Sequence, residues 1–119
     1  MSNNTEVQTH DCVARIEEKY PEMTAEFKRI QMHQYQLFCR KQEDYGSGNI
    51  SLGTPLITDE ERKMSLTGLW FRINDKIQRI KNLLMESSPT NNEPMEDSFL
   101  DASNYSIMAL IVSVGKWGK

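Results

Sequence analysis

A row of large apolar residues in the second half of the chain limits the possible folds more than any other feature. Its members follow one another at intervals of three or four residues, so they share one face of a helix. The row consists of Trp70, Ile73, Ile77, Ile80 and Leu84. We predict that this face lies in the core and that the helix extends over residues 58–85.

Signals for helix ends favour an all-α fold. Pro21 suits the first turn of a helix, and Gly46 suits the position after a last turn. Thr58 and Glu61 match a capping box, and no strand-like alternation persists anywhere. Helices are expected over residues 10–20, 22–43, 58–85 (interrupted near 65–68) and 95–114, with loops at 46–56 and 86–92. The prediction is a helical bundle of three long helices plus a short N-terminal helix.

The length of 119 residues indicates one domain. We expect a flexible N-terminus over residues 1–9, a single all-α domain over residues 10–115, and a C-terminal tail over residues 116–119. The small size and the seven methionines predict that the bundle forms a homo-oligomer.

Composition excludes several classes of protein. A net charge of −3 argues against general nucleic-acid binding, which needs a basic surface. Cys12 and Cys39 lie far apart and outside any metal-binding motif, which favours a reducing compartment. The N-terminus does not resemble a signal peptide, and the apolar run Ile107–Val112 is too short to span a bilayer. We therefore predict a cytoplasmic protein that does not contact membranes.

Three acidic residues near the C-terminus form a ladder. Glu93, Asp97 and Asp101 recur every four residues, so their carboxylates share one helix face. Like charges on one face repel, which indicates a partner for them, either a divalent cation such as Mg²⁺ or basic side chains. Alternatively, the first acids simply favour the positive end of the helix dipole.

A basic group lies on the helix that carries the apolar row. Arg72, Lys76 and Arg79 are spaced for one face, and Asn82 extends the same flank. Arginine and lysine are suited to phosphate groups, so the face predicts a site for a phosphorylated nucleotide. The alternative is that these cations pair with the acidic ladder of the next helix.

A third group ends the preceding helix, at Lys41, Asp44, Tyr45 and Gly46. Tyr45 offers a ring for stacking on a base, and a glycine-rich loop follows that can expose N–H groups to anions. The alternative is an ordinary charged helix end with a glycine stop.

The three groups together resemble the nucleotide modification associated domain family of phages and bacteria. The resemblance covers about Phe38–Val112 and implies an association with phage nucleotide metabolism. The residues that carry it are Lys41, Asp44, Tyr45 and Gly46, then Lys76, Arg79, Asn82 and Leu83, then Glu93, Asp97, Asp101, Asn104 and Tyr105.

The chain is also distantly similar to all-α nucleotide pyrophosphohydrolases of the MazG type. Those enzymes hold Mg²⁺ with acids on two helices. Here only half of such a four-acid cage is visible, with Glu93, Asp97 and Asp101 as the expected ligands and Asp44 as a further candidate acid.

Three hypotheses for function stay open. The first is a phage-type protein that binds or sequesters a nucleotide, for example against host defences that signal with nucleotides. The second is a Mg²⁺-dependent pyrophosphohydrolase, although no catalytic residue is identified. The third is a structural accessory of a DNA-modification complex, in which the charged faces form salt bridges between helices.

Overall fold

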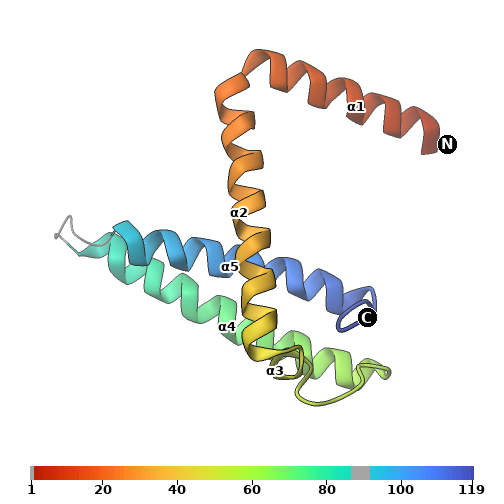
Figure 1. Cartoon of the computed structure of the whole chain (residues 1–119), viewed down its shortest axis with the longest axis vertical. Helices are drawn as coiled ribbons and strands as arrows, with labels where there is room; N and C mark the ends of the chain where they lie inside the picture. The colour runs from red at the N-terminus through yellow and green to blue at the C-terminus, as the bar shows by residue number, and fades with distance from the viewer. Residues whose placement is uncertain (1, 87–91) are drawn as a thin grey trace. The chain divides into compact units, whose positions relative to one another are not determined.

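The computed structural model describes the backbone of residues 2–86 and 92–119 and the side chains of residues 5–86 and 94–119. Within these residues the chain forms helices and no strand (Figure 1), which confirms the all-α prediction. The helices are α1 (Ser2–Lys19), α2 (Pro21–Tyr45), α3 (Gly48–Ser51), α4 (Asp59–Met85) and α5 (Asn92–Ser113). None of them is both long and apolar enough to cross a bilayer.

Contacts divide the chain into two units, residues 1–36 and residues 37–119. The first unit holds α1 and the start of α2, joined by a salt bridge between Glu17 and Lys28. Helix α1 begins at Ser2 rather than at the expected His10. No apolar side chain described in this unit is buried, so the unit has no core of its own. The predicted domain boundaries at residues 9 and 115 stay predictions.

The second unit is built on a hairpin of two long helices. Helices α4 and α5 run side by side in opposite directions (Figure 1). The end of α2, the short α3 and the residues after α5 add to one shared core. Its buried apolar members are Ile50, Leu56, Leu69, Met108, Val112 and Trp117. Trp117, which the sequence placed in the tail, therefore belongs to the core.

Local signals for helix ends are confirmed. Helix α2 begins at Pro21, and Gly46 follows its last residue with φ of 72°. In the left-handed region a glycine avoids the strain of a Cβ, so Gly46 can donate its N–H to the Gln42 carbonyl and close the last turn.

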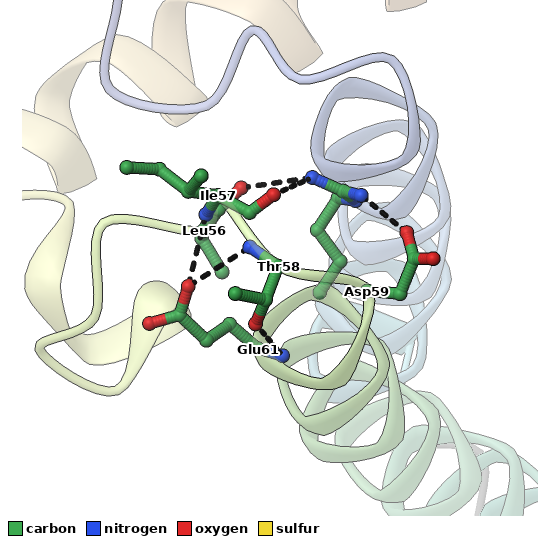
Figure 2. Close-up of polar contacts among 6 residues, drawn as sticks. Leu56, Ile57, Thr58, Asp59 and Glu61 are labelled. Carbon is green, nitrogen blue, oxygen red and sulfur yellow. Dashed lines mark hydrogen bonds and ion pairs between the residues drawn. The ribbon is translucent and has the colours of Figure 1, made fainter.

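The capping box at the start of α4 is also confirmed (Figure 2). The Glu61 N–H donates to Thr58 Oγ1 over 3.1 Å, and Glu61 Oε1 accepts from the Thr58 N–H over 3.0 Å. The same carboxylate accepts from the Ile57 N–H. The Arg62 guanidinium donates to the carbonyls of Leu56 and Ile57. These contacts hold the end of the preceding loop against α4.

The segment expected as a loop between residues 46 and 56 contains the short helix α3, and two side chains fix it. Ser65 of α4 is 1% exposed and donates its hydroxyl to the Ile50 carbonyl over 2.7 Å. Trp117 donates its indole N–H to the Ser47 carbonyl over 3.0 Å. Helix α4 is continuous through Ser65, so the expected interruption near residues 65–68 is wrong. The Ser65 hydroxyl donates to Ile50 of α3, so it does not compete for the backbone hydrogen bonds of its own helix.

The prediction that the Trp70 row forms the core is wrong for three of its five members. Trp70, Ile77 and Leu84 are 59%, 51% and 65% exposed, whereas Ile73 and Ile80 are half-buried. The fully buried position on this side of α4 is Leu69, at 1% exposed. Periodicity correctly gave the apolar side of α4, but α5 covers only one edge of that side.

Candidate functional site

A pocket of about 370 Å³ lies in the second unit, among α2, α3, α4 and α5. From α2 and α3 it is lined by Lys41, Gln42, Tyr45, Asn49 and Ile50. From α4 and α5 it is lined by Arg72, Lys76, Asp101, Tyr105 and Met108. The pocket therefore brings together residues of four helices.

Asp101 bridges two lysines across this pocket. Its Oδ1 accepts from Lys41 Nζ over 3.0 Å, and its Oδ2 lies 3.1 Å from Lys76 Nζ. The Asp101 side chain is 14% exposed, and those of Lys41 and Lys76 are 37% and 26% exposed. Each carboxylate oxygen therefore holds one lysine, and the ion pairs join α2 and α4 to α5.

The ion pairs determine the charge of Asp101. Burial is the largest single influence on its pKa and acts to raise it, because a desolvated carboxylate is costly. Hydrogen bonds from Lys41 and Lys76, with the attraction of their charges, together outweigh burial and lower the pKa of Asp101 below its ordinary value. Asp101 is therefore ionised at neutral pH.

Arg72 adds a third cation to the pocket. Its guanidinium carbon lies 5.9 Å from the centre of the Tyr105 ring, a distance at which the ring attracts the cation. Among the described side chains, three cations (Lys41, Arg72 and Lys76) and one carboxylate (Asp101) thus line the pocket. The difference, three minus one, is an excess of two positive charges in a protein of net charge −3.

Two apolar residues of the pocket wall are buried. Ile50 and Met108 are each 4% exposed, and the hydroxyl of Ser65 holds the Ile50 carbonyl. Tyr45 lines the pocket while 71% exposed, so its ring lies at the rim. A rigid base with cations around it and an accessible aromatic ring can receive an anionic, partly aromatic ligand.

Residues 41–112 match the family model of nucleotide modification associated domain 1. The match covers more than half of the chain. The chain belongs to this family. All the residues that line the pocket fall within the matched range. No curated protein and no solved structure matches the chain.

Five of the residues predicted to bind a nucleotide meet in this pocket of the family domain. Four of them come from the helix end and the basic face that the sequence singled out, and the fifth is a tyrosine from the resemblance to the family. These five are Lys41, Tyr45, Arg72, Lys76 and Tyr105. The alternative interpretation, in which the basic face pairs with the acidic ladder, also holds for Lys76 because it contacts Asp101.

The other four predicted residues do not line the pocket. Asp44, Arg79 and Asn82 are exposed, and Asn104 is buried at 5% exposed. Arg79 lies one turn beyond Lys76 on α4.

Sequence reasoning missed four of the lining residues: Gln42, Asn49, Ile50 and Met108. One signal was present, because Met108 follows Asp101 and Tyr105 at the spacing i, i+4, i+7 and therefore shares their face of α5. Asn49 and Ile50 lie in the segment taken for a loop, where periodicity gives no information.

The acidic ladder is divided in the structure. Asp101 is in the pocket, and Asp97 is exposed one turn before it. The side chain of Glu93 lies outside the described residues. Among those described, no group of three potential metal ligands occurs, and both oxygens of Asp101 hold lysines. Ligation of Mg²⁺ by Glu93, Asp97 and Asp101 stays a prediction.

Proposed function

We propose that the family domain binds a phosphorylated nucleotide in this pocket, with its phosphates on Lys41, Lys76 and Arg72. The observation that carries the proposal is the local excess of positive charge around one bridging carboxylate. A phosphate presents anionic oxygens of the kind that Asp101 already presents to the two lysines. The volume of about 370 Å³ falls within the usual range for small-molecule sites.

The lysines have the capacity for this ligand. An ammonium group has three N–H donors, and each lysine uses one on Asp101. Further donors on each side chain can contact phosphate oxygens while Asp101 keeps the ammonium groups in place. Arg72 adds a planar guanidinium, which suits two phosphate oxygens at once.

The nucleoside part of the ligand is assigned to the aromatic rim. Tyr45 is exposed, and Tyr105 lines the same pocket beside Arg72. A base that stacks on such a ring typically gains about 1–3 kcal/mol. The family's description, which refers to nucleotide modification, supports a nucleotide over another anion.

Titration calorimetry with pyrophosphate and a panel of nucleotides tests the proposal. The panel contains NTPs, dNTPs, cyclic di- and trinucleotides and ADP-ribose, with and without Mg²⁺. We expect Lys76→Ala to weaken binding about 10- to 100-fold, because it removes a charge-assisted hydrogen bond worth about 1.5–3 kcal/mol. Arg72→Ala is expected to have a similar effect.

Lys81→Ala is the matched control. Lys81 is an exposed lysine of the same helix that does not line the pocket, so its loss removes the same charge and should leave affinity unchanged. If Lys76→Ala and Lys81→Ala weaken nucleotide affinity equally, the protein attracts the ligand only through its overall charge, and the pocket is not a specific site. If no member of the panel binds, the structural-accessory hypothesis replaces the proposal.

Binding need not involve turnover. The proposal contains no hydrolytic step, because the carboxylate that lines the pocket is held by two lysines. A protein of this kind acts by sequestering its ligand. Chromatography of each nucleotide after incubation distinguishes this from hydrolysis: an intact ligand agrees with sequestration, and release of a monophosphate would require the pyrophosphohydrolase hypothesis.

A further inference from the structure

Large apolar side chains remain uncovered on both helices of the α4–α5 hairpin. Those on α4 include Trp70, Ile77 and Leu84, at 59%, 51% and 65% exposed. Those on α5 include Phe99 and Leu110, at 54% and 67% exposed. We call these five residues the back face.

The back face lies on the side of the hairpin away from the pocket. Residues two apart on a helix point about 160° away from each other. Trp70 is two residues from Arg72, Phe99 two from Asp101, and Leu110 two from Met108, and each of these three partners lines the pocket. Both helices therefore present charge to the pocket and apolar side chains to the other side.

The spacing on α4 indicates that the covering element is another helix. Trp70, Ile77 and Leu84 are seven residues apart, with Ile73 and Ile80 between them at the second position of the same repeat. Two alternating apolar positions per seven residues form the seam of packed helices. Ile73 and Ile80 are half-buried, so this edge of the seam is covered within the chain. The edge formed by Trp70, Ile77 and Leu84 is not covered.

The uncovered area matches one half of a dimer interface. Five side chains of this size and exposure present together roughly 600 Å² of apolar surface, close to the ~800 Å² that each partner buries in a standard interface. A patch of this size is at the upper limit for a monomer.

We propose that a second copy of this chain covers the back face. Two hairpins that pack through the same surface form a four-helix bundle with two-fold symmetry, in which each apolar row meets an equivalent row. The pockets then lie on the outer sides of the bundle, one for each copy. The interface is therefore independent of ligand binding.

Sedimentation velocity of the full chain at about 1–100 µM tests this interface. We expect the wild type to sediment at twice the chain mass of 13.8 kDa. Ile77→Glu and Leu110→Glu should each give the mass of a single chain, because each buries a charge in an apolar seam. Gln78→Glu is the matched control: it adds the same charge at the adjacent exposed residue outside the back face and should remain dimeric.

Two results would overturn the proposal. A wild type that is monomeric throughout the range shows that something other than a second copy covers the face, such as residues 1–36 of the same chain or a different protein. A dimer that survives both substitutions but is lost in Phe27→Glu lies elsewhere, on the exposed surface of the first unit. Circular dichroism confirms that each variant is folded, and Ile77→Gln provides a milder change at the same position.

Discussion

The two sides of the α4–α5 hairpin differ in whether their side chains find contacts within the chain. On the pocket side Asp101 holds two lysines, Arg72 lies over Tyr105, and Ser65 donates to Ile50. On the back face Trp70, Ile77 and Leu84 remain more than half exposed. On the pocket side the side chains contact one another within the chain. On the back face apolar side chains of the kind found in a core are left exposed to solvent.

This difference shows that apolar periodicity and burial within one chain are separate properties. Leu69 and Trp70 are neighbours, yet they are 1% and 59% exposed. The larger side chain is the exposed one, so hydrophobicity alone does not decide which residue is covered. Coverage depends on where α5 crosses α4, and the uncovered remainder is available to a second molecule.

The largest expected effect separates these two neighbours. Leu69→Ala should lower the free energy of unfolding by about 2–5 kcal/mol, because it leaves a cavity in the core. Trp70→Ala should instead remove the dependence of Tm on protein concentration, since it weakens the proposed dimer. Thermal melts at several concentrations measure both effects. Equal, concentration-independent losses for the two variants would mean that Trp70 packs within its own chain.

The local parts of the fold were predictable from the sequence. Gly46 and the pair Thr58 and Glu61 act within one or two turns of helix, so their residue types were enough to place the ends of α2 and α4. The buried face of α4 was not predictable in the same way. Which face of α4 is buried depends on α5, and the position of α5 is set by contacts between residues far apart in sequence.

The candidate site was predictable in its chemistry but not in its connections. Arg72 and Lys76 were expected to share a face that suits phosphate, and both line the pocket. Lys41 was assigned beside Asp44, but its ion pair is with Asp101, which is 60 residues away. No spacing rule reports a contact of that separation. Ile50 was missed for the same reason, because its carbonyl is held by the hydroxyl of Ser65, which is 15 residues away.

A smaller effect tests how firmly the pocket side is fixed. Ser65→Ala should cost about 0.5–1.5 kcal/mol, the usual value of one buried hydrogen bond, since the Ile50 carbonyl loses its donor. Thr67→Ala is the control, because Thr67 also donates to a carbonyl but on the exposed side of α4. Urea denaturation compares them. If the two losses are equal, the Ser65 contact does not hold α3 in place.

The smallest effect concerns acid, and it tests the bridge at Asp101. Burial raises the pKa of Asp101, but the hydrogen bonds and charges of Lys41 and Lys76 lower it by more. The pKa of Asp101 is therefore lowered in the folded protein. A lowered pKa stabilises the fold above the ordinary aspartate value of about 3.9, and this stability is lost as the pH falls through the folded pKa. Asp101→Asn should therefore cost less than about 1 kcal/mol at pH 7.

The difference between Asp101→Asn and the wild type should then shrink as the pH is lowered below about 4, because the wild-type carboxylate becomes protonated as well. Urea denaturation at pH 7 and pH 3 measures this change. Asp97→Asn removes the same charge from an exposed position one turn earlier on α5, and is the control for loss of net charge. A cost for Asp101→Asn that stays the same at both values of pH would show that the carboxylate acts through packing. The pocket side would then be held, like the back face, by the fit of its side chains and not by charge.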